Sequence, residues 1–205
     1  MKVLRPTLLV VVCLVLMGRV ALSAQQEIVS EKNEYGGQTV ALTYSPEDNE
    51  YQLEMSRRII FYDGNGKMAK SELFYTDKSA SEKGIRRRIS YFDGNEKVTK
   101  SEIFYTDESA DESGVTKGII FYDGNEKMTR SELFYTDKSA SEKGVNRRIL
   151  YYGSDEKMTK WEFFYTGKVT SERGANRGVA YFDGNEQVTK VEFYMDDRLV
   201  QTKTY

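Results

Sequence analysis

Apolar and polar residues alternate in short stretches along most of this chain, and residues typical of turns separate the stretches. Around Phe61 the sequence reads "RRIIFY", then "DGNG", then "KMAKSELFYT". The two flanking stretches are rich in β-branched and aromatic residues, which favour strands. The segment between them contains glycine and asparagine, which adopt positive φ at little cost. The pattern therefore predicts a β-hairpin.

This hairpin pattern recurs every thirty residues. The motif "FYDGNGKM" begins at Phe61, and its copies begin at Tyr91, Phe121, Tyr151 and Tyr181. A fixed period of this size is typical of arrays in which each unit packs against its neighbours. We therefore predict an all-β fold in which five hairpin repeats form an elongated, twisted antiparallel sheet or a solenoid. A closed β-barrel is the alternative, because closure would remove both edges of the sheet.

The repeats also set the expected boundaries. We predict a signal peptide over 1–24, an N-terminal capping segment with a degenerate half repeat over 25–56, five hairpin repeats over 57–195 and a C-terminal capping strand over 196–205. Atypical end units are expected because they cover the outermost repeats. The polar segments between hairpins, such as "DKSASEKG", are predicted to be loops. Each ends in a glycine that can adopt a left-handed conformation.

Residues two apart in a strand share a face of the sheet, which predicts the contents of each face. We expect the columns that begin with Ile59, Phe61 and Leu73 to lie on one face. The opposite face would be mixed and would carry Tyr62 together with Glu72.

The charged residues suggest a pairing register. If Phe61 pairs with Ala69, an arginine lies opposite a glutamate in three hairpins: Arg58 and Glu72, Arg88 and Glu102, Arg148 and Glu162. Opposite charges across strands favour such a register by roughly 0.2–1 kcal/mol per pair. On this interpretation the recurring charges form a solvated, salt-bridged surface.

The first residues have the layout of a secretory signal. Lys2 and Arg5 precede the apolar run 7–17, which is short for a membrane span, and small residues follow up to Ala24. We therefore expect a secreted, periplasmic or cell-surface protein with no stable membrane insertion after removal of the signal. A retained anchor is the alternative.

Charge bears on the choice of partners. Of the 30 lysines and arginines, Lys2, Arg5 and Arg19 lie in the predicted signal, so the remaining chain carries 27 basic and 32 acidic residues and a net charge of −5. Nucleic acid binding requires a basic surface, so we expect no nucleic acid partner.

Residues suited to catalysis or metal binding are scarce. The chain has no histidine, and its one cysteine, Cys13, lies in the predicted signal. The commonest general base and the commonest ligands of transition metals are therefore missing. Every strong feature occurs once per repeat, whereas an active site is usually unique. We expect no enzyme activity, no cofactor and no metal site, and leave open whether acidic segments such as "DESADES" bind calcium weakly.

The aromatic residues are the best candidates for binding. Tyrosine offers a flat apolar ring and a hydroxyl, which suit stacking on sugars or docking of a protein. We predict binding roles for one aromatic column and for the single tryptophan: Tyr62, Phe92, Tyr122, Tyr152, Phe182 and Trp161.

The segment from Phe61 to Met68 and its copies resemble known aromatic hairpin repeats. "YFDGNEK" is similar to the cell-wall- and glucan-binding repeats of Gram-positive surface proteins, although "AKSE" or "TKSE" follows here instead of a Gly-Trp pair. The repeats also resemble the tyrosine–aspartate repeats of secreted shell-forming proteins and the MORN-type hairpins. These resemblances imply an array used for binding or assembly. We thus expect an exported repeat protein that binds a cell-envelope polysaccharide or a partner protein, with self-association through sheet edges as the alternative.

Overall fold

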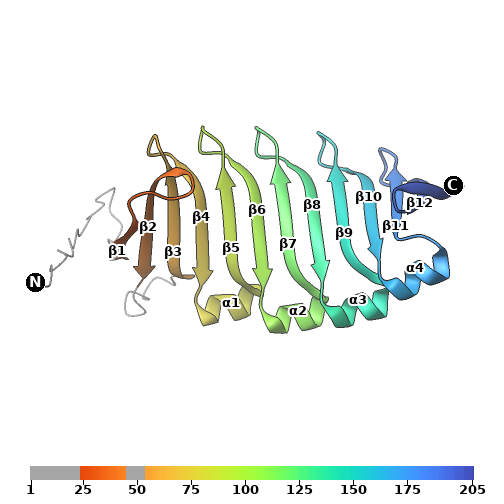
Figure 1. The fold of residues 1–205 in the computed structure, drawn as a ribbon, viewed down its shortest axis with the longest axis horizontal. Coiled ribbons are helices and arrows are strands. Elements are labelled where there is room, and N and C mark those ends of the chain that lie inside the picture. Colours follow the sequence, from red (N-terminus) through yellow and green to blue (C-terminus); the bar gives the residue numbers. More distant parts are fainter. Residues whose placement is uncertain (1–23, 45–53) are drawn as a thin grey trace, which may run out of the picture.

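The chain folds into one open antiparallel sheet of thirteen strands that lie side by side in sequence order (Figure 1). The computed structural model describes residues 24–44 and 54–205. The predicted all-β hairpin array is confirmed, and the barrel alternative is wrong because the sheet does not close. The predicted signal peptide, apart from Ala24, lies outside the described residues.

Tight turns connect the strands at one of their ends, and four short helices lie in a line at the opposite ends of the strands (Figure 1). The strands are β1 Ala24–Ser30, β2 Gly36–Tyr44, β3 Met55–Asp63, β4 Met68–Tyr75, β5 Ile85–Phe92, β6 Val98–Tyr105, β7 Val115–Tyr122, β8 Met128–Tyr135, β9 Val145–Tyr152, β10 Met158–Tyr165, β11 Arg177–Phe182, β12 Val188–Met195 and β13 Arg198–Thr204. The helices are α1 Asp77–Lys83, α2 Asp107–Ser113, α3 Asp137–Lys143 and α4 Gly167–Arg173.

In four of the five repeats the hairpin turn begins with an aspartate, whereas the turn over 153–156 begins with Gly153. In the first, Asp63 Oδ1 accepts hydrogen bonds from the backbone N–H groups of Asn65 and Lys67, at 2.8 and 2.9 Å. The left-handed position is the fourth residue of the turn. Gly66 occupies it in this turn, but a glutamate occupies it in the next four turns: Glu96, Glu126, Glu156 and Glu186. The expectation that glycine or asparagine supplies the positive φ therefore holds only for the first turn.

The segments between hairpins are helices, not the predicted loops. The hydroxyl oxygen of Thr76 accepts a hydrogen bond from Ser79 N at 3.3 Å at the start of α1, and Gly84 ends this helix with φ of 66°. A capping threonine and a left-handed glycine are the usual signals of helix ends. The helices were missed because each has only seven mostly polar residues, without an apolar face. The left-handed conformation predicted for the closing glycines is confirmed at Gly84, Gly114, Gly144 and Gly174.

Successive helices are joined end to end. The carbonyl oxygen of Gly84 accepts a hydrogen bond from Thr106 N, the N-cap of α2, at 3.0 Å. A Cβ atom on Gly84 would lie 2.6 Å from Ser109 Oγ. The same carbonyl contact recurs from Gly114 and from Gly144 to the next N-cap threonine. Glycine is therefore needed here both for its conformation and for its small size.

The described sheet has no second layer over either face, so its buried residues are few. Among apolar side chains, Ile60, Ile89, Ile149 and Val179 are buried between their neighbours within the sheet. Ser101 is fully buried. The side chains of adjacent strands must therefore cover one another.

A bulge near each turn sets the register. Phe61 pairs with Lys70 and Tyr62 with Met68, so Ala69 is the extra residue of β4. In later repeats a threonine occupies the bulge, and Thr99 Oγ1 donates a hydrogen bond to the carbonyl oxygen of Tyr91 at 3.3 Å.

The predicted register is wrong by one residue because of this bulge. Glu72 pairs with Ile59, and Arg58 pairs with Leu73, so the proposed pairs of Arg58 with Glu72, Arg88 with Glu102 and Arg148 with Glu162 do not form. The Leu73 column consequently lies on the face opposite the Ile59 column. Tyr62 likewise lies on the face opposite Glu72.

We expect Gly84→Ala to lower the free energy of unfolding by roughly 2 kcal/mol or more. The left-handed conformation costs an L-residue about 1–2 kcal/mol, and the overlap with α2 adds to it. Gly94→Ala is the matched control, because nothing lies within 4 Å of its added Cβ and its φ is not positive. Urea unfolding measures the free energy of unfolding of both variants. Equal losses would contradict this role of Gly84 in the contact between α1 and α2.

Glu126→Gly should raise the free energy of unfolding by roughly 0.5–1 kcal/mol. Relief of the left-handed conformation exceeds the extra entropy of glycine in the unfolded chain. The reverse change, Gly66→Glu, should lower it by a similar amount. Thermal unfolding checks both variants. A change of Tm in the same direction for both would contradict a cost of the left-handed conformation at this position of the turn.

Candidate binding faces of the sheet

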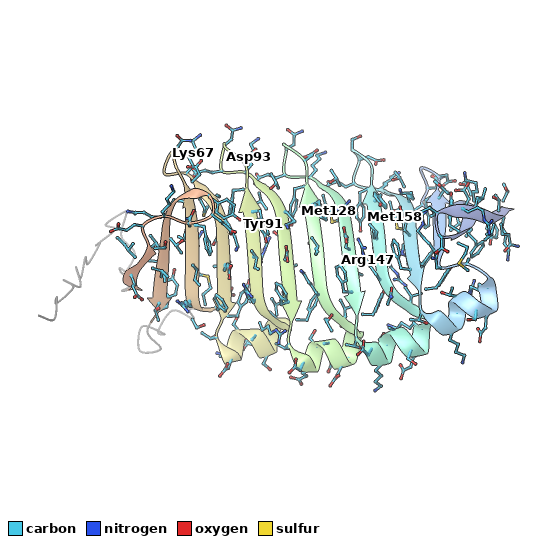
Figure 2. All side chains as sticks on the ribbon, in the orientation of Figure 1. Lys67, Tyr91, Asp93, Met128, Arg147 and Met158 are labelled. Carbon is cyan, nitrogen blue, oxygen red and sulfur yellow. The ribbon has the colours of Figure 1, made fainter. Side chains whose placement is uncertain are left out.

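Both faces of the sheet present repeated side chains along its length (Figure 2). We call the face that carries Glu72, Glu102, Glu132, Glu162 and Glu192 the glutamate face, and the other, which carries Trp161, the tryptophan face. Lys67 and Asp93 lie in the hairpin turns at the ends of the strands (Figure 2).

The centre of the glutamate face is a row in which an aliphatic residue alternates with a glutamate from strand to strand. Glu72 lies between Ile59 on one neighbouring strand and Ile89 on the other. The same arrangement continues to Val179 and Glu192. The aliphatic side chains thus separate the carboxylates, so that like charges are not direct neighbours.

Toward the turns, each glutamate is paired with a cation two residues earlier in its own strand. We call these five residues the turn-side cation row: Lys70, Lys100, Arg130, Lys160 and Lys190. Each of them lies 2.9–3.0 Å from its glutamate. Each also covers an aromatic ring of the adjacent strand, as Lys100 Nζ does at 3.9 Å from the Tyr91 ring centroid.

Toward the helices, a second cation reaches the same glutamate from the next strand. This helix-side cation row consists of Arg87, Lys117, Arg147 and Arg177. Lys117 Nζ lies 2.6 Å from Glu102, and Arg147 Nη2 lies 2.5 Å from Glu132. Arg147 also lies between two rings, 5.4 Å from Phe134 and 5.1 Å from Phe164 (Figure 2).

Lowered pKa values favour the ionised form of four of the five glutamates. Burial alone would raise the pKa of the Glu102 carboxyl, but hydrogen bonds and charge from Lys117 and Lys100 lower it to about 2. The pKa values of Glu72 and Glu162 are also lowered, against the effect of burial, by their hydrogen-bond partners and cations. At Glu192, hydrogen bonds from Tyr194, Lys190 and Tyr181 lower the pKa to about 2.

The two signs of charge differ in depth. The glutamate side chains in these pairs are 6–13% exposed, whereas the side chains of the two cation rows are 14–39% exposed. The carboxylates therefore lie beneath a layer of ammonium and guanidinium groups.

The tryptophan face carries all six predicted binding residues. Trp161 packs against Phe182 with their ring centroids 6.3 Å apart, and Arg148 lies 4.3 Å from its ring. The buried indole Nε1 has no hydrogen-bond partner among the described residues. Phe163 also contacts Trp161, with ring centroids 4.6 Å apart. The structure thus brings two of the six candidates together, at the end of the sheet nearer β13.

The other candidates form a row beside the turns. Tyr62 pairs with Met68 across its hairpin, and the same position holds Phe92, Tyr122 and Tyr152 in the following repeats. These rings occur on every second strand, about 10 Å apart, so an aliphatic or methionine side chain separates them. Met128 in β8, between the strands that carry Tyr122 and Tyr152, is one of these separating residues (Figure 2). The expectation that this row shares a face with Lys70 and Glu72 is wrong.

The cation rows were not predicted as functional residues. Their signal in the sequence is a basic residue, any residue and glutamate in every repeat, from Lys70 to Glu72 through Lys190 to Glu192, followed by another basic residue fifteen positions after four of the glutamates. The charges were interpreted as cross-strand pairs because the bulge was not anticipated.

Two further features are absent from residues 24–44 and 54–205. No three histidine, cysteine, aspartate or glutamate side chains come together there in a way that could hold a metal ion. Among the same residues, no helix has the length and apolar character needed to cross a membrane.

No known protein-family model matches the chain, and no curated protein matches it. The site must therefore be interpreted from its own geometry.

Low pH is expected to lower the free energy of unfolding because it protonates Glu102. The folded pKa of Glu102, about 2, lies below its ordinary value of 4.5. The stability from this group is therefore fully present above pH 4.5 and is lost as the pH falls toward 2. Glu102→Gln should destabilise the protein most at neutral pH, because Lys100 and Lys117 then lack their shared anion.

Urea unfolding at a series of pH values tests this. The curves of the wild type and of Glu102→Gln should converge as the pH falls from 4.5 toward 2. Parallel curves would mean that this carboxylate does not contribute through its charge.

Proposed function

We propose that this chain is an exported, non-enzymatic repeat protein that binds a cell-envelope polymer or a partner protein on a face of its sheet. The observation that carries the proposal is the repetition, in register, of the same aromatic and charged side chains across a face that nothing covers in the described part of the chain. A long polymer would contact several repeats at once, so weak contacts would add up to useful affinity.

The state of the glutamates supports a binding role over catalysis. The pKa values of Glu72, Glu102, Glu162 and Glu192 are all lowered, and each of the four accepts hydrogen bonds from at least two side chains. General acid–base catalysis works best with a group whose pKa lies near the operating pH. These carboxylates are suited to organising cations.

Self-assembly is a second candidate, favoured by the strands at the two ends of the described sheet. Exposed large apolar side chains are concentrated there: Ile28 and Val29 in β1, Leu199 and Val200 in β13. Every residue of β13 is exposed. Unpaired edges of this kind can pair with another chain.

Co-sedimentation with the cell-envelope fraction of the host tests the proposal. We expect the chain without residues 1–24 to sediment with the envelope. A variant that lacks residues 91–120, which removes one complete period, should bind more weakly because fewer contacts act together. Circular dichroism would establish that the shortened sheet is folded.

The alternatives give different results. A chain that stays in solution and forms large species alone in sedimentation velocity would replace binding with self-assembly. A chain that neither sediments with the envelope nor assembles would contradict both candidates.

A further inference from the structure

Cations outnumber carboxylates on the glutamate face. The two cation rows supply nine positive charges for five glutamates. In each of the four complete units, from Glu72 to Glu162, one carboxylate holds two cations, so one positive charge per thirty-residue period is not balanced within the face.

The unbalanced charge is accessible. A lysine ammonium has three N–H donors and a guanidinium has five, and the glutamate beneath takes only part of them. Lys100, for example, makes its ion pair with Glu102 at 2.9 Å while its side chain is 30% exposed. Arg130, at the equivalent position, is 36% exposed and pairs with Glu132. The ammonium and guanidinium groups on the outside of this face therefore have N–H donors that the glutamates do not occupy.

The excess is greatest in the middle of the sheet. At the two ends, acidic side chains from outside the two rows approach the cations: Glu34 lies 3.7 Å from Lys70, and Asp197 lies 3.1 Å from Arg177. Many other acidic residues lie on the sheet edges, in the turns and in α2, whose sequence is "DESADES". Although the chain as a whole is acidic, the central part of the glutamate face, over β6–β10, is therefore cationic.

We propose that this central part of the glutamate face binds a linear acidic polysaccharide through the carboxylates of its sugars. The inference deepens the proposed function and rests on it. Each cation row runs across the strands, along the length of the sheet, with successive members on every second strand and about 10 Å apart. An extended polymer with regularly spaced carboxylates can follow such a row and meet a donor at each repeat.

The same geometry disfavours other polyanions. The aromatic rings of this face lie under cations, as Tyr151 lies under Lys160 at 3.8 Å, so they are not free to stack on nucleic acid bases. Insertion into a bilayer uses exposed apolar side chains, and the exposed large apolar residues of the described chain lie in the edge strands, in β12 and at Tyr205. A carboxylated sugar chain needs only the ionic contacts that the face offers.

Binding to polygalacturonate, measured by isothermal titration calorimetry, tests the proposal directly. We expect binding that weakens as salt is added, and none to the fully methyl-esterified polymer, in which the sugars remain and the charges are gone. A single-stranded DNA oligonucleotide and vesicles containing phosphatidylglycerol should bind more weakly than polygalacturonate.

Paired variants locate the site. Lys100→Gln with Lys160→Gln should weaken binding about 2- to 30-fold, the range expected for the loss of two exposed ionic contacts. Lys78→Gln with Lys138→Gln makes the same change in charge on exposed positions of α1 and α3 and should leave the affinity unchanged. Lys100→Arg with Lys160→Arg should retain binding, because Arg130 already occupies an equivalent position. Circular dichroism would establish that each variant is folded.

Several results would overturn the inference. They are no binding to polygalacturonate, equal binding to the methyl ester, tighter binding to DNA or vesicles, or equal losses in the two glutamine variants. If the chain still sediments with the cell envelope in those cases, the proposed function stands and only the polysaccharide class is wrong. If it does not sediment either, both proposals are wrong.

Discussion

The main constraint on this protein is that the described sheet has no second layer. In most sheets one face is covered by helices or by another sheet, and burial of that face supplies much of the stability. Here each side chain must be covered by its neighbours in the same layer. This explains why aromatic and long charged side chains are so frequent: a lysine stem or a guanidinium lying on a ring buries apolar area while its charged end stays in water. The glutamates complete the arrangement because they hold these long side chains down.

Contacts between successive helices and between successive turns, at the two ends of the strands, also link neighbouring repeats. Each helix is joined to the next through a glycine carbonyl, and the turns are joined through lysines. Lys97 Nζ, for instance, donates a hydrogen bond to the carbonyl oxygen of Gly124 in the following turn, at 2.6 Å. The same contact links Lys157 to Gly184. Contacts at both ends of the strands therefore reinforce the spacing of neighbouring repeats, which the hydrogen-bonded strands set.

Much of this architecture could be predicted from the sequence, because period and alternation report directly on strands. The register could not, since it depends on a bulge at Ala69 and its equivalents, and a single extra residue exchanges the faces of a strand. The prediction from charge preferred an arginine opposite Glu72, whereas the actual partners are two residues earlier in the same strand and on the neighbouring strand. Opposite charges in a strand sequence therefore do not identify which pairs meet.

The helices show a different limit. Thr76 and Gly84 mark the two ends of α1, but seven polar residues have no apolar period and look like a loop. What stabilises the segment is its contact with the next helix, which is a property of the array. The candidate site suffered from the same gap. Trp161 and the Tyr62 row were predicted to bind because aromatic residues recur in register along the sequence, whereas the role proposed for Lys100 and Arg147 depends on which face they share.

The line of helix contacts through Gly84, Gly114 and Gly144 also bears on how such a chain changes over generations. Because the contact between one repeat and the next is nearly the same each time, an inserted or deleted period would meet surfaces that already fit it. The near identity of the segments at Phe61 and Phe121 offers long matching stretches for recombination between them. Length can thus vary in steps of a whole repeat without any new interface, and the number of repeats becomes a property that selection can adjust independently of the fold.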